Sequence, residues 1–427
     1  MNNYLKKGVK VARRHKTILE NFSWVTAVEV FMLLAPFITY PYLTKVLGLE
    51  LYGLVISAQV LASYATLIID FGSNSVVAKH VSINRHDNDM LSEIVSSVFT
   101  VRSFLWVVCF VIYITVVLLV KTYRNEWLLF LFTYGLTLHD VLFPRYFFQG
   151  IEKMRISSII NIGIKLLFIL LVFVVVRSED DYLYVPLLYT AGYTLAGVVS
   201  MYIIFGKMKL RFYIPPVNRM MIYVKDSAAI FATDIIRTVK DKFNYFFLGG
   251  YSGMANVVVY DLGIKLNSII VKPTQIIGQV LFPRFAKTRD TRKLNIMTWV
   301  VFFITLATVI LVNIFMPWIA KFFLHTDIDL LPLRIFSLAP VFLSVASFIA
   351  SNYFVAYGHN KYMLYSIIVT TVAYLGGLGF VAVTGHMNSV YSFVSISLFS
   401  YFVEFLYRVI TKERLLRKEA KQDNTKH

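Results

Sequence analysis

The sequence predicts an all-α membrane protein of about twelve transmembrane helices in two six-helix bundles, with both termini cytoplasmic. Apolar residues make up 58% of the 427 residues and charged residues only 15%. Soluble domains average about 45–50% apolar and 25% charged residues. Apolar stretches of about 20 residues, each long enough to cross a ~30 Å hydrocarbon core, recur along the whole chain. Lys and Arg gather in alternate connecting segments, as expected for a chain that crosses a membrane repeatedly.

Hydropathy and helix-breaking residues predict the individual helices in order. The first half is expected to hold helices over residues 21–47, 52–71, 91–120, 127–148, 157–177 and 183–205. The second half is expected to hold helices over residues 227–249, 256–282, 296–323, 335–357, 362–384 and 389–410. Two halves of similar length suggest a parallel repeat of two six-helix bundles, an arrangement common in secondary transporters.

This pattern divides the chain into four parts. An N-terminal lobe is expected over residues 1–206, a basic cytoplasmic linker over 207–226, a C-terminal lobe over 227–410, and a basic cytoplasmic tail over 411–427. Pro215 and Pro216 lie inside the linker. The stretch 25–42 is predicted to be a first spanning helix rather than a cleavable signal peptide, because it lacks a small-residue cleavage site.

The net charge of +18 follows from the same topology. The basic segments 6–16, 207–225, 284–293 and 408–426 all fall on the side of the N-terminus, whereas the opposite segment from Ser178 to Asp181 is acidic. The excess of cations in loops on one side therefore explains the charge, and we expect no nucleic-acid partner. The single cysteine, Cys109, lies in an apolar run and has no partner for an internal disulfide.

Charged residues inside the predicted helices are the main candidates for function, because a charge in the bilayer usually faces a cavity or a partner. In the predicted helix 227–249, Asp234, Arg237, Asp241 and Asn244 share one stripe, with Lys240 and Lys242 nearby. Arg237 is spaced to pair with Asp234 and Asp241. In the helix 256–282, a polar stripe follows steps of three and four: Asp261, Lys265, Ser268, Lys272, Gln275 and Gln279.

The first half has a weaker counterpart. One helical face is predicted to carry Tyr52, Gln59, Ser63, Thr66 and Asp70, and the isolated charges are Glu29 and Lys165. Alternatively, such ion pairs are structural links between packed helices. Lys240 and Lys242 are alternatively side chains that snorkel to the membrane interface. In the second half, five cations (Arg237, Lys240, Lys242, Lys265, Lys272) outnumber three carboxylates (Asp234, Asp241, Asp261), which favours an anionic substrate.

Several classes of protein are excluded by missing motifs. The sequence contains no Gly-x-x-x-x-Gly-Lys-Ser/Thr motif, no His-Glu-x-x-His motif and no Cys/His cluster with zinc spacing. No segment between the predicted helices reaches the roughly 50 residues that a folded catalytic domain needs. We therefore expect no enzymatic activity, no cofactor and no metal, and a secondary transporter remains.

Several motifs resemble those of a known family. These are Pro41-Tyr42-Leu43-Thr44-Lys45-Val46-Leu47-Gly48 with Tyr52-Gly53, Asp70-Phe71-Gly72-Ser73-Asn74, Ser82-Ile83-Asn84-Arg85, Leu91-Ser92-Glu93-Ile94, and Phe147-Phe148-Gln149-Gly150-Ile151-Glu152-Lys153-Met154. Lys265 and Phe282-Pro283-Arg284 fit the pattern as well. Together they resemble the Wzx-type O-antigen and polysaccharide repeat-unit flippases of the MOP/MATE-like superfamily. One departure is visible at Arg145-Tyr146, where members of that family often carry Trp before Phe-Phe-Gln-Gly.

The resemblance implies a MATE-like fold in the bacterial inner membrane and the flipping of an undecaprenyl-diphosphate-linked oligosaccharide from the cytoplasmic to the periplasmic leaflet. It also implies alternating access around a cationic cavity, coupled to a proton or Na⁺ gradient. We expect the substrate to contact Arg237, Lys240, Lys265, Lys272, Gln59, Asn244 and Gln275, and coupling or gating to involve Glu29, Asp70, Asp234, Asp241 and Asp261.

Membrane lipids, a polysaccharide polymerase and a chain-length regulator are the other expected partners. Two alternatives remain open. A MATE-like small-molecule antiporter would favour an acidic cavity for organic cations. An integral-membrane polymerase or glycosyltransferase would need a large outward-facing loop, which the hydropathy does not predict.

Overall fold

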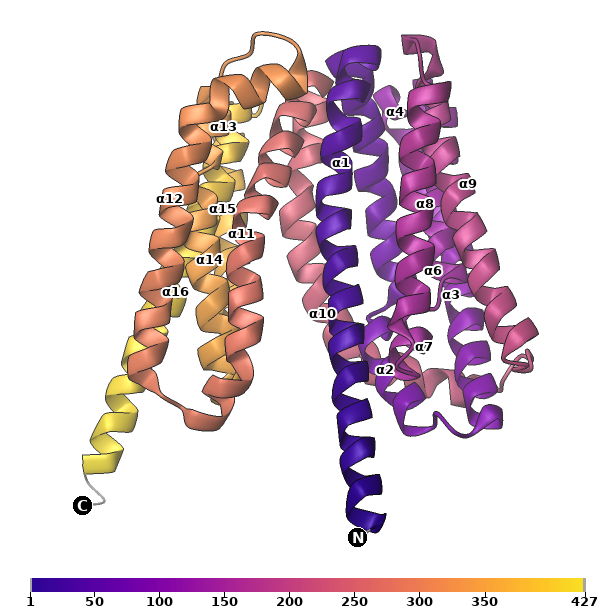
Figure 1. Ribbon diagram of the computed structural model, residues 1–427. Coiled ribbons are helices and arrows are strands. Elements are labelled where there is room, and N and C mark those ends of the chain that lie inside the picture. Colours follow the sequence, from indigo (N-terminus) through magenta and orange to yellow (C-terminus); the bar gives the residue numbers. More distant parts are fainter. Residues whose placement is uncertain (1, 425–427) are drawn as a thin grey trace. The chain divides into compact units, whose positions relative to one another are not determined.

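The computed structural model describes the backbone of residues 2–424 and most side chains from residue 24 to 419; the side chains of residues 25, 26, 28, 29 and 32 are not described. Over these residues all regular structure is helical. The chain forms two compact units (Figure 1). Unit 1 comprises Met1–Leu51 and Ala58–Ile235, and unit 2 comprises Tyr52–Ser57 and Ile236–His427. The divisions thus fall within two helices, Asn2–Asp70 and Val217–Phe247, and the expected boundaries at residues 206 and 226 stay predictions.

Unit 1 contains nine helices and the beginning of a tenth. They are α1 (Asn2–Asp70), α2 (Ser73–Ile83), α3 (Asn88–Leu119), α4 (Lys121–Asn125), α5 (Trp127–Tyr134), α6 (Leu138–Leu142), α7 (Arg145–Gly150), α8 (Met154–Val175), α9 (Tyr184–Met201) and the first turns of α10 (Val217–Phe247). Within α1 the helical backbone breaks at Gly48, whose φ of 71° and ψ of 170° suit glycine far better than other residues. This break lies where the sequence predicts the end of the first helix.

The core of unit 1 explains why the Phe-Phe-Gln-Gly motif has those residues. Phe147 and Phe148 on α7 are completely buried against α2 and α3. Gly150 ends α7 so close to α2 that an added Cβ would lie 2.5 Å from the side chain of Val81 and 2.8 Å from the carbonyl oxygen of Ala78. The motif therefore packs a short helix tightly onto its neighbour.

Unit 2 contains the remaining helices. They are α11 (Met254–Thr288), α12 (Thr291–Leu324), α13 (Leu331–Phe336), α14 (Ala339–Ile349), α15 (Asn360–Val383) and α16 (Val390–Asn424). Helix α14 lies inside this bundle, against α11, α12 and α16. The buried cluster around Phe348 and Ile349 joins α14 to Phe285 on α11 and Val301 on α12. Packing between helices far apart in the sequence thus builds the unit.

Ten elements among the described residues are long and apolar enough to cross a membrane. Two features account for the difference between these ten elements and the predicted twelve helices. The first two predicted helices lie in one continuous element, Leu33–Ile83. The predicted helix 227–249 corresponds to part of α10, whose charged residues keep it out of the apolar set. The number twelve and the sides of the termini stay predictions.

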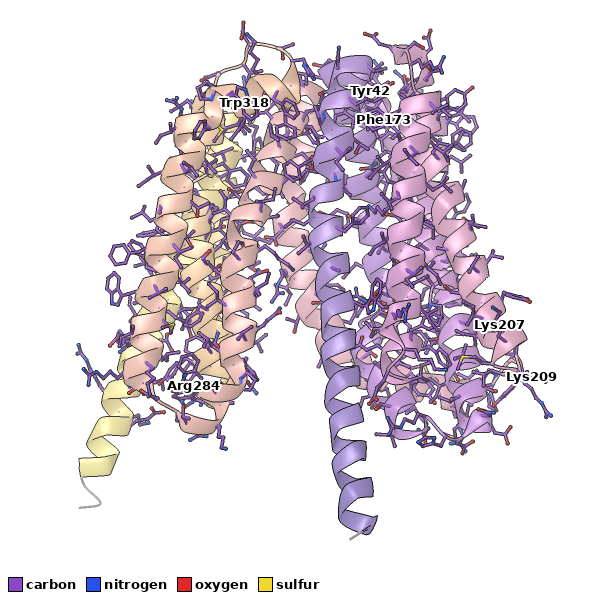
Figure 2. All side chains as sticks on the ribbon, in the orientation of Figure 1. Tyr42, Phe173, Lys207, Lys209, Arg284 and Trp318 are labelled. Carbon is purple, nitrogen blue, oxygen red and sulfur yellow. The ribbon has the colours of Figure 1, made fainter. Side chains whose placement is uncertain are left out.

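Each unit is asymmetric along its helices. In unit 1, Lys207 and Lys209 lie at the opposite end from Tyr42 and Phe173, whose rings are 4.5 Å apart (Figure 2). In unit 2, Arg284 lies at the opposite end from Trp318 (Figure 2). Cations at one end and aromatic residues at the other are typical of helices that cross a bilayer.

Candidate functional site

The polar stripe predicted from residue spacing occupies one open face of α11. Ser268, Gln275 and Gln279 are exposed, and Lys265 and Lys272 are half-buried. The opposite face of α11 is apolar and buried against α13 and α14, with Leu262, Leu266 and Ile270 at its centre. Unit 2 therefore buries the apolar face of α11 and leaves its polar face partly exposed.

Asp261 starts this stripe and is the most buried of its members. Its carboxylate forms an ion pair with Lys265 and accepts a hydrogen bond of 3.0 Å from the hydroxyl of Tyr245 on α10. The side chain of Lys265 is 26% exposed, against 9% for that of Asp261. With Lys272 two helical turns further on, the stripe carries two lysines and one carboxylate, which leaves it with net positive charge.

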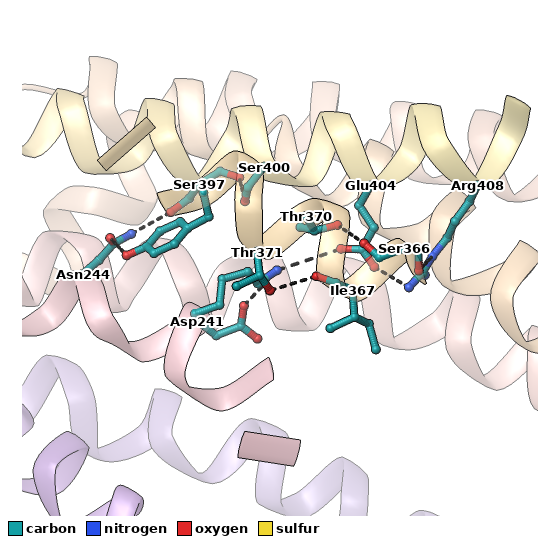
Figure 3. A network of polar contacts seen from close by, with 12 residues as sticks. Asp241, Asn244, Ser366, Ile367, Thr370, Thr371, Ser397, Ser400, Glu404 and Arg408 are labelled. Atoms are coloured by element: carbon teal, nitrogen blue, oxygen red, sulfur yellow. Dashed lines mark hydrogen bonds and ion pairs between the residues drawn. The ribbon is translucent and has the colours of Figure 1, made fainter. Parts of the chain in front are cut away.

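The charges of α10 separate into an exposed and a buried group. Arg237 is exposed, whereas Lys240 is 9% exposed. The Lys240 ammonium lies 3.4 Å from Asp241 and 3.9 Å from Glu404 on α16, two carboxylates that Figure 3 labels. It also lies 4.8 Å from the ring centre of Tyr401. Helical phase alone suggested Arg237 as the partner of Asp241; the ion pair that the structure gives Asp241 is with Lys240.

Arg408 completes this buried group, and sequence reasoning missed it. Its guanidinium lies 2.5 Å from Glu404, donates a 3.0 Å hydrogen bond to the hydroxyl of Ser366 on α15, and donates another of 2.9 Å to the carbonyl oxygen of Ala346 on α14 (Figure 3). A carboxylate and an arginine four residues apart inside the apolar stretch 389–410 were the available signal. Arg408 thereby joins α14, α15 and α16.

Asn244 is buried at 1% exposure and has its amide fully hydrogen-bonded within unit 2. It donates to the hydroxyl groups of Ser397 at 2.8 Å and Tyr260 at 2.9 Å, and accepts from the hydroxyl of Tyr374 at 2.5 Å (Figure 3). In this conformation Asn244 links α10 to α11, α15 and α16. A contact between Asn244 and the substrate would require these bonds to exchange.

Unit 1 contains a second buried charge that the sequence reasoning missed. Arg102 on α3 is 1% exposed and forms an ion pair with Asp70 at the end of α1. It also donates to the hydroxyl of Ser73 at 2.7 Å and to the carbonyl oxygen of Asp140 at 2.6 Å. Its guanidinium carbon lies 5.3 Å from the ring centre of Tyr146. The available signal was that Arg102 is the only Lys or Arg in α3.

The remaining predicted residues differ in their exposure. Gln59 on α1 and Asp234 on α10 are half-buried members of unit 1, and Gln275 is exposed in unit 2. The side chain of Glu29 lies outside the described residues. Among the side chains that the structure describes, no three His, Cys, Asp or Glu residues are grouped so as to hold a metal ion.

Relatives and solved structures agree with this architecture. A Shigella dysenteriae protein named "Putative O-antigen transporter" is 25% identical over 261 residues, which cover 60% of this chain and 64% of the relative. A protein of the same name from Escherichia coli is 22% identical over 283 residues, 64% of this chain and 66% of the relative. The chain thus spans slightly less than two thirds of these relatives. Their names describe transporters, in agreement with the expected absence of enzymatic activity.

Two structures show the same fold at low sequence identity. An inward-facing multidrug resistance MATE family transporter of the MOP superfamily gives a TM-score of 0.67 at 15% identity, covering 89% of this chain and 96% of its own. The lipid II flippase MurJ, in an inward closed conformation, gives a TM-score of 0.63 at 13% identity, covering 92% and 87%. The expected MATE-like fold is therefore confirmed.

The family itself is shown by a match over most of the chain. The family model described as "Polysaccharide biosynthesis protein" matches residues 18–289, more than half of the 427 residues. The match includes the motifs of the first half and the whole of α11. Together with the ten apolar helices it confirms the expected multi-pass protein of the bacterial inner membrane. The chain belongs to the polysaccharide biosynthesis protein family.

Proposed function

We propose that this protein is a flippase that moves an undecaprenyl-diphosphate-linked oligosaccharide from the cytoplasmic to the periplasmic leaflet by alternating access. The relatives named as O-antigen transporters and the fold shared with a lipid II flippase support this class of substrate. The observation that carries the proposal is the open, positively charged stripe on α11.

This stripe is costly to place against lipid. A Lys at the centre of a membrane helix costs about 2.5–3.5 kcal/mol even on the most lenient scale, so such residues face a water-filled path or a partner. Lys265, Lys272 and Gln275 lie on the uncovered face of an apolar spanning helix. A wet path lined by two lysines and one carboxylate attracts anions, and a diphosphate is an anion with several acceptor oxygens.

The proposed roles of the individual residues follow from their exposure. Lys265, Lys272 and the exposed Arg237 bind the diphosphate, and Gln275 and Gln59 contact the sugars. Lys240 and Asn244 have protein partners in this conformation. They reach the substrate in a state in which those contacts have exchanged. The polyprenyl chain stays in the lipid.

Coupling to an ion gradient is part of the same proposal. Asp261, Asp241 and Asp70 each hold a cation of the protein, namely Lys265, Lys240 and Arg102. A carboxylate that takes up a proton or Na⁺ releases its cationic partner. Ion uptake thereby frees a positively charged side chain to bind the substrate. Asp234 and Glu29 are proposed for the same role on the basis of their positions in the sequence. Contacts with a polymerase and a chain-length regulator stay predictions.

The test is the flipping of a fluorescent polyprenyl-diphosphate oligosaccharide in proteoliposomes. A hydrogen bond to a charged group contributes about 1.5–3 kcal/mol, so Lys265→Gln and Lys272→Gln are each expected to weaken the apparent affinity about 10- to 100-fold. Because Lys265→Gln alone leaves the buried Asp261 without its cation, the double change with Asp261→Asn separates substrate binding from a folding defect. Lys287→Gln, on the exposed last turn of the same helix, is the matched control and is expected to flip normally.

The outcomes separate the possible functions. Normal flipping by all lysine variants would reduce these charges to structural ion pairs. Failure of the wild-type protein to flip this lipid, together with export of organic cations, would favour the MATE-like antiporter instead. The fold alone does not decide between the two, because it is shared with both kinds of protein. Collapsing the proton or the Na⁺ gradient in the same vesicles identifies the coupling ion.

A further inference from the structure

The segment that connects α9 to α10 combines exposed cations with exposed apolar side chains. We call residues 207–222 the basic linker. Its exposed cations are Lys207, Lys209, Arg211 and Arg219, and no Asp or Glu occurs between Lys207 and Lys225. Interleaved with them are exposed apolar residues: Phe212, Tyr213, Ile214, Val217, Met221 and Ile222. Ile214 is 73% and Val217 66% exposed, which is unusual for residues of this type unless something covers them.

The backbone of the basic linker is fixed on unit 1. The amide N–H of Arg211 donates a 3.0 Å hydrogen bond to the hydroxyl of Ser92, and that of Tyr213 donates one of 3.3 Å to the hydroxyl of Ser96, both on α3. The ring of Phe212 packs edge-on against Phe99 with centroids 5.5 Å apart. The exposed side chains are therefore presented by an ordered surface rather than by a loose tether.

The position of the basic linker places this surface at the membrane boundary. Lys207 ends the apolar span Glu179–Lys207, and α10 begins ten residues later at Val217. At 1.5 Å per residue, the 31 residues of α10 extend about 46 Å, more than the ~30 Å of a hydrocarbon core. Helix α10 is therefore longer than the core, and its first turns follow directly on the connection from the end of the span Glu179–Lys207. Figure 2 shows Lys207 and Lys209 at this end of unit 1.

We propose that the basic linker binds the anionic phospholipid surface of the leaflet next to it. Ile214 and Val217 insert at the boundary between headgroups and acyl chains, and Lys207, Lys209 and Arg211 contact lipid phosphates. The linker itself has no acidic residue, and of its exposed cations Arg219 has a carboxylate neighbour, Glu93 on α3 at 4.0 Å. A surface that combines apolar and cationic side chains in this way binds anionic interfaces through both buried apolar area and charge. The neighbouring spans keep it at the lipid boundary, which favours a lipid headgroup over a soluble acidic partner.

Site-directed spin labelling tests this surface directly. The label is placed at Ile214→Cys in a Cys109→Ala background, in nanodiscs of phosphatidylcholine alone or enriched in phosphatidylglycerol. Accessibility is measured to oxygen, which concentrates in lipid, and to a water-soluble nickel complex. Ile83→Cys is the matched control: Ile83 is equally apolar and 69% exposed in the same unit, but it precedes Asp87 and Asp89.

We expect the label at position 214 to shift towards lipid when phosphatidylglycerol is added, while the label at position 83 does not respond. In the variant Lys207→Gln/Lys209→Gln/Arg211→Gln, the equilibrium constant for insertion is expected to fall roughly fivefold for each cation removed. A label at position 214 that stays accessible to nickel in both bilayers would overturn the proposal. So would a triple variant that responds to phosphatidylglycerol as strongly as its parent.

Discussion

Removal of the buried guanidinium of Arg102 is expected to destabilise unit 1 strongly. The variant Arg102→Leu leaves the carboxylate of Asp70 and the carbonyl oxygen of Asp140 without their cation, and Ser73 without its donor. Breaking a buried ion pair by removing one partner costs about 3–5 kcal/mol. Asp70 is 23% exposed and keeps a 2.7 Å hydrogen bond from Asn74, so the lower end, about 3 kcal/mol, is expected.

The assay is the free energy of unfolding in mixed detergent micelles, followed by the loss of helical signal. The matched control is Arg85→Leu, which removes an ion pair of 3.1 Å to Glu152 whose side chains are 42% and 53% exposed. An exposed pair of this kind contributes about 0–1 kcal/mol.

A double-mutant cycle then separates the ion pair from simple packing. The double variant Arg102→Leu/Asp70→Asn removes both charges, so it is expected to recover about 1–3 kcal/mol relative to the sum of the single variants. Two results would refute this reasoning. One is a free energy of unfolding of Arg102→Leu equal to that of Arg85→Leu, and the other is additivity of the effects of Arg102→Leu and Asp70→Asn.

Two further predictions concern packing and pH. Gly150→Val is expected to lower the free energy of unfolding by about 1–3 kcal/mol, because the new Cβ lies 2.5 Å from Val81. The control in the same assay is Gly163→Val, because a Cβ added at Gly163 has nothing within 4 Å. Hydrogen bonds from Lys293 lower the pKa of Asp290, between α11 and α12, below its ordinary 3.8. A carboxylate whose pKa is lowered by folding stabilises the folded state at pH values above its ordinary pKa. This contribution is lost as the pH falls through the folded-state pKa. Between pH 5 and 3, the free energy of unfolding of Asp290→Asn is therefore expected to decrease less with falling pH than that of the unchanged protein. The same pH dependence in both proteins would contradict this assignment.

Much of the fold followed from the sequence because membrane helices are long and apolar. The helices predicted over 91–120, 157–177 and 296–323 correspond to α3, α8 and α12. The stripe on α11 was predictable for a related reason: its members are all on one helix, and a period of 3.6 residues fixes which side chains share a face. Gly48 was predictable as a break because glycine readily adopts a positive φ.

The partners of the buried charges were not predictable in this way. The local spacing on α10 pointed to Arg237 beside Asp241, but the position of Glu404 on α16 makes Lys240 the buried cation. Likewise, Arg102 finds Asp70 only because α3 packs against the end of α1. These pairs join residues far apart in the sequence, and nothing in the local period of either helix specifies the other.

By itself, the sequence determined the class of protein, its membrane location, its family and the face on which α11 carries charge. Each of these depends on composition, on a motif or on the geometry of one helix. The tertiary structure decided which cations are buried beside a carboxylate and which are left open. Burial depends on how neighbouring helices pack, and a charge inside the fold is tolerated only where that packing supplies its partner.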